Sequence, residues 1–154
     1  MGGSLSRRLR SQKGADQGLS PARSAASQAL KRVQEEGAYA SEAIEALINA
    51  TDIPASDKAF AATLVRGVVR TQGVLDQMLD GYLEKPNRVR PDVRRALQIA
   101  AYELLFLGKE AFSAVDQGVR LTAKSAPYAR RLANAVLRKV AVSAQAFPTG
   151  CPEE

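Results

Sequence analysis

The chain has 154 residues, 45% of them hydrophobic and 25% charged, which suits one packed globular domain of ordinary size. The sequence has no histidine, a single cysteine and no apolar run long enough to cross a bilayer, which excludes zinc fingers, disulfide scaffolds, Ser-His-Asp or Cys-His catalysis and a membrane span. Lysine and arginine number 22 against 16 acidic residues, and the net charge of +6 favours a polyanionic partner such as nucleic acid.

Residues 1–19 are predicted to be a disordered basic arm, because they are rich in Ser, Gly, Arg and Gln and hold few large apolar side chains. Such an arm can lie along phosphate groups and become ordered on contact. Three alternatives remain open: an N-myristoylation pattern, an organellar transit peptide and an inert tail. No apolar run typical of a secretory signal is present. The phosphate-contacting candidates in the arm are Arg7, Arg8, Arg10 and Lys13.

From Ser20 onward, apolar residues recur at three- and four-residue steps, which predicts helices throughout. Ser20 and Pro21 form the N-cap and the first-turn proline of the first helix, which ends at Gly37. A second helix is expected over about residues 41–50. No stretch alternates between apolar and polar residues for long enough to predict a strand.

Two further elements are expected in the middle of the chain. Ser56 can cap a third helix that ends near Gly73, and a short fourth helix is expected over residues 74–82. The division near Gly73 predicts two small bundles, the first formed by helices one to three and the second by helices four to seven.

The second half of the chain holds the most regular helical pattern. Pro91 opens a helix whose apolar surface is wide enough for it to be the central, most buried one. Ser113 is expected to cap a sixth helix, and Pro127 ends it. A seventh helix follows. The helical domain is therefore expected over residues 20–143, with a tail or linker over 144–154.

Little in the sequence points to catalysis or to a bound cofactor. Neither G-x-G-x-x-G nor G-x-x-x-x-G-K occurs, so no phosphate-cradling loop is predicted. The acidic residues between 35 and 57 are not expected to hold a metal ion, but they could face a basic protein. Glu103 and Asp116 are expected to cap or brace helix ends, and Cys151 is expected to be unreactive. No catalytic residue, metal or cofactor is predicted.

Basic residues with an aromatic companion are the strongest functional signal. Tyr128 precedes Arg130 and Arg131 at the start of the last helix, where free N–H groups, forked guanidinium donors and a stacking ring suit an unpaired polynucleotide. The first helix begins beside the basic arm and Arg23. If the two helix starts are neighbours, they form one continuous RNA site. A further basic segment over 84–95 is typical of a solvated helix face.

Several short motifs resemble the NusB family, the all-helical RNA-binding factors of bacterial transcription antitermination. They are Leu64-Val65-Arg66-Gly67-Val68-Val69-Arg70, Ala101-Tyr102-Glu103-Leu104, Ala114-Val115-Asp116-Gln117-Gly118-Val119 and Ala133-Asn134-Ala135-Val136-Leu137-Arg138-Lys139. The resemblance covers about residues 21–142. It implies an all-α, NusB-like fold of about seven helices in two small bundles.

A closer likeness is to the NusB-like N-terminal domain of bacterial ribosomal RNA cytosine-C5 methyltransferases, the RsmB (Sun or Fmu) group. Glu36 to Ala40, Leu64 to Arg70 and Tyr102 to Leu107 fit that group better, and residues 147–154 resemble its connector to the methyltransferase. The resemblance implies a cytoplasmic domain that recruits substrate ribosomal RNA and performs no bond chemistry itself. A freestanding antitermination factor that binds RNA and ribosomal protein S10 is the alternative.

The chain departs from the family pattern at two places. It has Asp116-Gln117 where family members commonly have Asn-Glu, and Leu132-Ala133-Asn134 where they have Phe-Val-Asn. The missing aromatic at Leu132 removes one RNA contact that the resemblance would imply, so Tyr128 and the arginines carry more of the prediction. The complete set of predicted RNA-binding residues is Arg7, Arg8, Arg10, Lys13, Arg23, Tyr128, Arg130 and Arg131.

Overall fold

Helices make up almost all of the computed structural model, which describes residues 18–146. The elements in chain order are α2 (Pro21–Glu36), α3 (Ala40–Ala50), α4 (Ala55–Tyr82), the single turn η1 (Pro86–Arg88), α5 (Pro91–Leu105), α6 (Ala111–Ser125), the single turn η2 (Pro127–Ala129) and α7 (Arg130–Ala146). No strand occurs among these residues, which confirms the predicted all-α fold. Residues 1–17 of the predicted arm over 1–19, and Cys151 with the rest of 147–154, lie outside the described residues.

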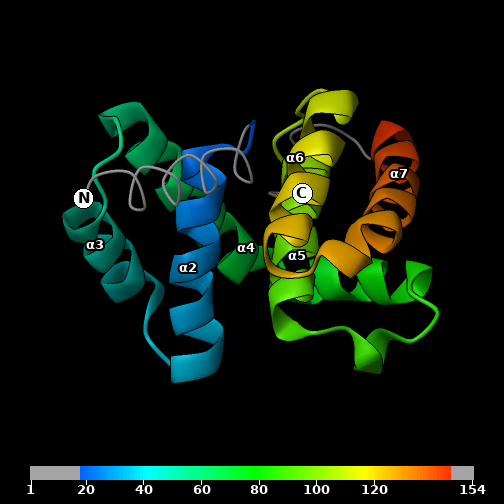
Figure 1. Ribbon diagram of the computed structural model, residues 1–154, viewed down its shortest axis with the longest axis horizontal. Coiled ribbons are helices and arrows are strands. Elements are labelled where there is room, and N and C mark those ends of the chain that lie inside the picture. The colour runs from blue at the N-terminus through cyan, green and yellow to red at the C-terminus, as the bar shows by residue number, and fades with distance from the viewer. Residues whose placement is uncertain (1–17, 147–154) are drawn as a thin grey trace, which may run out of the picture.

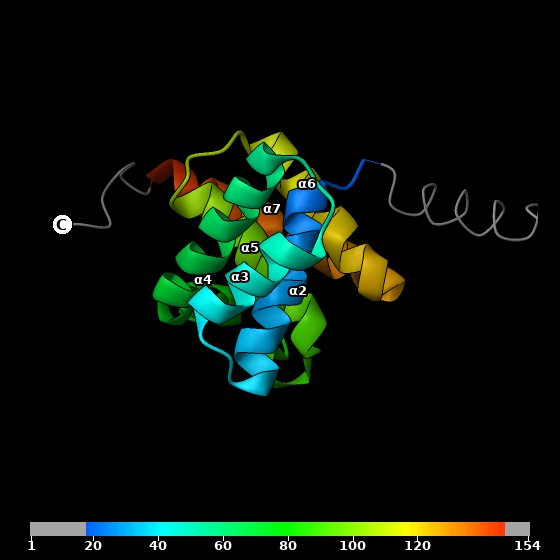
Figure 2. The ribbon, with the colours of Figure 1, turned by 90° about the vertical axis from the view of Figure 1, so that its left-hand side faces the viewer.

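The helices form two groups that share α4 (Figure 1). In one group α2 and α3 pack on each other and on α4, and in the other α5, α6 and α7 pack on one another. Figure 2 looks onto α3, with α5 and α7 behind it. Contacts of α2 with α5 and α6, and of α4 with α5 and α7, join the groups into one core. This is the predicted pair of small bundles, with one long helix common to both.

The first helix, α2, begins and ends where the sequence predicts. The Ser20 hydroxyl accepts a hydrogen bond from the backbone N–H of Arg23 at 3.4 Å, and Pro21 occupies the first turn. Gly37 ends the helix in the left-handed region, with φ +74°, where glycine carries no steric cost. The buried face of α2 consists of Ala22, Ala25, Ala26, Ala29 and Leu30. Such small side chains let neighbouring helices approach closely.

The helix α4 is continuous over 28 residues, so the predicted break near Gly73 is wrong. The helix also begins at Ala55, one residue before Ser56, and Ser56 does not cap it. The large apolar residues of α4 that are fully buried on both sides of Gly73 are Leu64, Val65, Val68, Leu75 and Leu79. The burial of this apolar stripe offsets the loss of helix stability caused by one glycine, which is about 1 kcal/mol relative to alanine.

Gly73→Ala is expected to raise the free energy of unfolding by roughly 0.5–1 kcal/mol. A Cβ at this exposed helical site would meet no atom within 4 Å, and alanine has less freedom to lose from the unfolded chain. Urea unfolding followed by circular dichroism measures the change. Gly37→Ala is the matched control and is expected to destabilise, because its φ of +74° strains any residue with a Cβ. Equal effects at both glycines would contradict the continuous helix.

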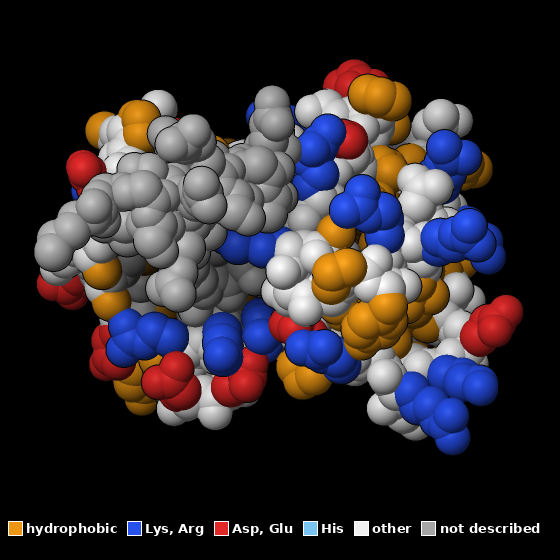
Figure 3. Space-filling view, in the orientation of Figure 1, with side chains coloured by type: hydrophobic (Ala, Val, Ile, Leu, Met, Phe, Trp, Pro, Cys, Tyr) orange, Lys and Arg blue, Asp and Glu red, His pale blue; other side chains and the backbone are white. Residues whose placement is uncertain are grey.

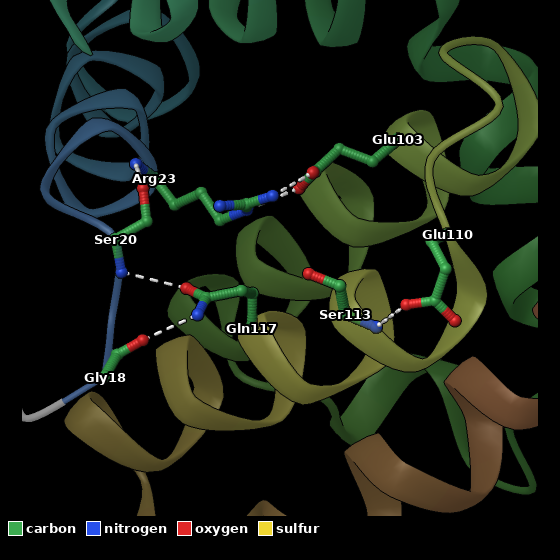
Figure 4. Close-up of polar contacts among 7 residues, drawn as sticks. All are labelled: Gly18, Ser20, Arg23, Glu103, Glu110, Ser113 and Gln117. Carbon is green, nitrogen blue, oxygen red and sulfur yellow. Dashed lines mark hydrogen bonds and ion pairs between the residues drawn. The ribbon is translucent and has the colours of Figure 1, made fainter.

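The central helix is α5, as predicted, and every residue from Ala96 to Leu105 is buried. Its neighbour α6 is capped by Glu110 and not by the predicted Ser113. The Glu110 carboxylate accepts hydrogen bonds from the backbone N–H groups of Phe112 and Ser113, both at 2.8 Å. Figure 4 shows the bond with Ser113. A carboxylate at a helix start also interacts favourably with the helix dipole. None of the helices within residues 18–146 has the length and hydrophobicity that a membrane span requires.

Candidate nucleic-acid interface

The side chain of Arg23 points into the protein rather than towards solvent. Its Nε donates to Oε2 of Glu103 at 2.8 Å, and its Nη2 pairs with Oε1 of the same carboxylate (Figure 4). The guanidinium also lies over the ring of Phe60, 5.2 Å from the ring centroid. Glu103 therefore braces the start of α2 against the last turn of α5, as expected. Asp116 instead pairs with Arg120 within α6, so the expected brace there is wrong. The position of Arg23 gives no support to its predicted contact with RNA.

The start of α2 is held by Gln117 of α6. The Gln117 side-chain oxygen accepts a hydrogen bond from the backbone N–H of Ser20 at 2.8 Å, and its amide donates to the carbonyl of Gly18 at 2.6 Å (Figure 4). Glutamine supplies both the donor and the acceptor, whereas the glutamate common in the family would supply acceptors only. Gln117 therefore sets the point at which residues 1–17 join the described domain.

The two helix starts that were expected to be neighbours lie apart. Ser20, before α2, contacts the middle of α6 at Gln117. Ser24 of α2 accepts a hydrogen bond from the long side chain of Lys124 near the end of α6, whereas α7 begins beyond that end, after η2. Between Gln117 and Ser125 the helix rises by about 12 Å, at 1.5 Å per residue. Figure 1 shows the start of α2 near the top of the molecule and the start of α7 at the lower end of α6. The predicted continuous site across both starts is therefore not formed by the described residues.

The three predicted residues at the start of α7 all lie on the surface. Tyr128, in η2, is 71% exposed, and Arg130 and Arg131 are also exposed. Neither arginine forms an ion pair with a described residue. Their charged groups are therefore available to an anionic partner.

A groove of 460 Å³ runs between the η1 segment and α7. We call it the basic groove. Its basic lining residues are Lys85, Arg88, Arg90 and Lys139, and Glu84 is the one carboxylate that lines it. Its apolar and aromatic lining residues include Leu83, Val89, Val93, Tyr128, Leu132 and Val136. The groove thus combines cationic donors with an exposed ring, which is the composition that suits an unpaired nucleic-acid strand.

Tyr128 connects the two sides of the basic groove. A hydrogen bond with the Tyr128 side chain, and then the charge of Asp92, raise the pKa of the Arg90 guanidinium above its ordinary value. Arg90 also donates to Asp92 through Nη2 at 2.7 Å. Arg90 is therefore partly occupied by protein partners, whereas neither Lys85 nor Arg88 forms an ion pair within residues 18–146.

The basic residues that line the groove from the η1 side are not among the predicted RNA-binding residues. The signal was present, because five lysines and arginines occur between residues 84 and 95. Periodicity could not show that this segment faces α7, about 40 residues further along the chain. In Figure 3 blue side chains surround orange ones over the half of this face that α5, α6 and α7 form.

No described residues form a group suited to metal binding: within 18–146, no three His, Cys, Asp or Glu side chains come together. A second groove, of 430 Å³, lies between α6 and α7 and is mostly apolar. Its lining includes Phe112, Val115, Val119, Arg138 and Val142. The basic groove is the better candidate for a polyanion, because it holds four basic side chains against one in the apolar groove.

The sequence model that describes the NusB family matches residues 20–142 of this chain. A putative methyltransferase of Mycobacterium tuberculosis is 34% identical over 125 residues, which are 80% of this chain and 27% of that protein. The ribosomal RNA small subunit methyltransferase B of Thermus thermophilus is 36% identical over 88 residues, which are 57% of this chain and 22% of that protein. The chain therefore spans about a quarter of the length of these methyltransferases.

Antitermination proteins are also similar. Transcription antitermination protein NusB of Nitrosococcus oceani is 35% identical over 98 residues, which are 62% of this chain and 66% of that protein. Among solved structures, NusB of T. maritima superposes with a TM-score of 0.67 at 24% identity, covering 79% of this chain and 88% of that one. At this identity the structural match supports the fold alone.

Proposed function

The chain belongs to the NusB family, and on that premise we propose that it binds ribosomal RNA as the substrate-recruiting N-terminal part of a ribosomal RNA (cytosine-C5) methyltransferase. The observation that carries the proposal is the basic groove, which the exposed Tyr128 lines, and the exposed Arg130 and Arg131 follow Tyr128 closely in the chain. Two of the similar proteins are named as methyltransferases, and the matched segment is only about a quarter of the length of each.

In this proposal the domain binds and orients RNA and does no bond chemistry. Lysine and arginine side chains neutralise phosphates, and the ring of Tyr128 stacks on an unpaired base. Tethered to a methyltransferase, the domain raises the local concentration of substrate RNA at the catalytic part. Arg7, Arg8, Arg10 and Lys13 stay predicted contacts of the arm, and a cytoplasmic location is part of the same proposal.

A freestanding antitermination factor is the second candidate. It is supported by the similarity to the Nitrosococcus protein, two thirds of whose length is matched. The exposed acidic side chains Glu36, Glu42 and Glu45 offer a surface for a basic protein such as ribosomal protein S10. A pull-down with S10 separates the candidates, because the recruiting domain is expected to leave S10 unbound. Calorimetry with S-adenosylmethionine is expected to show no heat of binding for this chain.

Charge reversal at Arg130 and Arg131 is expected to weaken RNA binding by roughly tenfold or more, because two phosphate contacts become repulsive. Fluorescence anisotropy with labelled ribosomal RNA fragments at two salt concentrations measures the affinity. Wild-type affinity is expected to fall steeply with salt, as counterion release requires. The control carries the same reversal at Arg66 and Arg70, which are exposed on α4 outside the groove. Equal losses in both variants would show a general charge effect and remove the α7 start from the proposed site.

A chain beginning at Gly18 tests the arm separately, since it keeps the Gln117 contacts to Gly18 and Ser20. It is expected to bind the same RNA more weakly and with a shallower salt dependence, because the arm carries four of the predicted phosphate contacts. Unchanged affinity and salt dependence would leave the arm without a role in RNA binding.

A further inference from the structure

Arg94 ties the basic side of the groove to the core of the domain through a hydrogen bond to Pro86, and Val89 of the same segment packs against the core. We infer that the segment from Lys85 to Arg90 is a preorganised phosphate-binding wall of the groove, and that Arg94 is the positioning residue that holds it. This inference rests on the proposed function. It adds a binding element that the residues around Tyr128 do not include, on the opposite side of the groove.

Arg94 of α5 contacts η1 and α4 at once. Its Nη2 donates to the carbonyl of Pro86 at 3.0 Å, inside η1. Its Nη1 donates to Asp80 at 2.6 Å and to Asp76 at 3.4 Å, both on α4. The Arg94 side chain is 18% exposed and that of Asp76 is 32% exposed, so their contact is partly shielded from water, whereas Asp80 is 48% exposed. One guanidinium therefore holds the backbone of η1 against two helices.

The same contacts continue into the buried core. Gln98 donates from Nε2 to Oδ1 of Asp76 at 2.8 Å, and Gln34 of α2 donates to Oε1 of Gln98 at 2.8 Å. Gln98 is 1% exposed, so its amide has little freedom to change partners. The hydrogen-bonded chain thus runs from α2 through α5 and α4 to η1, and it fixes the wall relative to both helical groups.

The wall itself is a short turn closed by its own backbone. The N–H of Arg88 donates to the carbonyl of Lys85 at 3.0 Å, and the N–H of Val89 donates to that of Pro86 at 3.4 Å. Two hydrogen bonds alone are weak support for three residues, because a single 3-10 turn is marginal without tertiary contacts. The bond from Arg94 to Pro86 supplies such a contact.

The charged groups of the wall are placed for phosphates. Lys85 and Arg88 are exposed, both line the basic groove, and Lys139 lines it from α7. Phosphodiester oxygens are the ligands that suit unpaired ammonium and guanidinium groups. A wall held in place before binding loses less conformational entropy when RNA arrives, which favours affinity. The ligand class is therefore the backbone of an RNA strand whose base reaches Tyr128.

The wall is tested with the double variant Lys85→Gln/Arg88→Gln, which removes two charges but no ion pair formed within residues 18–146. Anisotropy with the same ribosomal RNA fragments is expected to show roughly tenfold weaker binding, and a salt slope smaller by about 1.4, at about 0.7 per phosphate contact on a single strand. Hydrogen exchange at the amides of Arg88 and Val89 is expected to stay as in the wild type, because the turn keeps its support.

Arg94 is tested with Arg94→Gln and Arg94→Lys. Both are expected to speed exchange at the Arg88 and Val89 amides and to weaken RNA binding several-fold. Lysine keeps the charge but lacks the fork that reaches Asp80 and Pro86 together, so it is not expected to restore either property. Restoration of RNA affinity by lysine would show that charge alone matters and would overturn the positioning role. Unchanged amide exchange in Arg94→Gln would overturn it as well.

Failure of the wall and failure of the proposed function give different results. If Lys85→Gln/Arg88→Gln binds RNA as tightly as the wild type, the segment from Lys85 to Arg90 does not bind phosphates, but the proposal that the domain binds RNA is unaffected. If the wild-type chain binds no RNA at any salt concentration, the proposed function falls and this inference falls with it. If Arg94→Gln fails to fold, Lys85→Gln/Arg88→Gln still tests whether the wall binds RNA. That variant is expected to fold, because Lys85 and Arg88 are exposed.

Discussion

Gly67→Ala is expected to lower the free energy of unfolding by about 3 kcal/mol or to prevent folding altogether. A Cβ on Gly67 would lie 1.9 Å from Cζ of Tyr102 and 2.3 Å from its hydroxyl oxygen. Tyr102 is 4% exposed and its ring stacks on Phe106, with 5.6 Å between the ring centroids, so it has no free space to enter. Either α4 must move away from α5 or the tyrosine must leave the core. Urea unfolding measures the loss.

Two variants make this prediction specific. Gly73→Ala lies on the same helix at an exposed site and is expected to stabilise, so a loss at Gly67 alone identifies the contact with Tyr102 as its cause. Tyr102→Leu shortens the side chain, and adding Gly67→Ala to it is expected to cost much less than in the wild type. An unchanged urea midpoint in Gly67→Ala would refute the close approach of α4 and α5.

The Gly67 contact shows what short motifs can and cannot predict. The segment from Leu64 to Arg70 and the segment from Ala101 to Leu104 both carry the resemblance to the NusB family, and the structure brings them together through Gly67 and Tyr102. Each motif predicts a helix with a buried face. Neither contains the information that the glycine of one leaves room for the tyrosine of the other, because helical periodicity is a local property.

Local signals predicted the helices well and failed where tertiary packing competes with them. Caps and prolines placed α2 correctly, since Ser20, Pro21 and Gly37 act within one turn of the helix. Gly73 did not break α4, because buried residues on both sides of it outweigh the propensity of one glycine. The helix α6 begins at Ala111, before the predicted cap Ser113, and the Glu110 carboxylate accepts hydrogen bonds from the backbone N–H groups of Phe112 and Ser113.

The candidate site was only partly predictable, for a related reason. The sequence predicted Tyr128, Arg130 and Arg131 because they are close together in the chain and directly follow Pro127, at the expected start of a helix. Lys85 and Arg88 belong to the same groove only through the packing of α5 against α7, which no local pattern encodes. The partner of Arg23 was not predictable either: Glu103 lies 80 residues away in sequence, and no local pattern shows that the two side chains pair. The contact of Arg23 with RNA stays a prediction.

Arg23→Met is expected to lower the free energy of unfolding by about 3–4 kcal/mol, because it leaves the Glu103 carboxylate charged and without its partner inside the protein. The Glu103 side chain is 1% exposed and that of Arg23 is 13% exposed. Glu103→Gln is expected to cost less, since Arg23 is nearer to solvent and its guanidinium can turn outward. Urea unfolding gives both values. A larger loss of stability in Glu103→Gln than in Arg23→Met would contradict the deeper burial of Glu103.

The double variant Arg23→Met/Glu103→Leu separates stability from RNA binding. Replacing both charges with apolar side chains is expected to recover most of the stability lost in Arg23→Met, because no buried charge is left unpaired. Since the Arg23 guanidinium is occupied by Glu103 and lies over Phe60, the folded double variant is expected to bind ribosomal RNA as tightly as the wild type. A loss of tenfold or more in this variant would return Arg23 to the RNA-binding residues, and would mean that the ion pair opens when RNA binds.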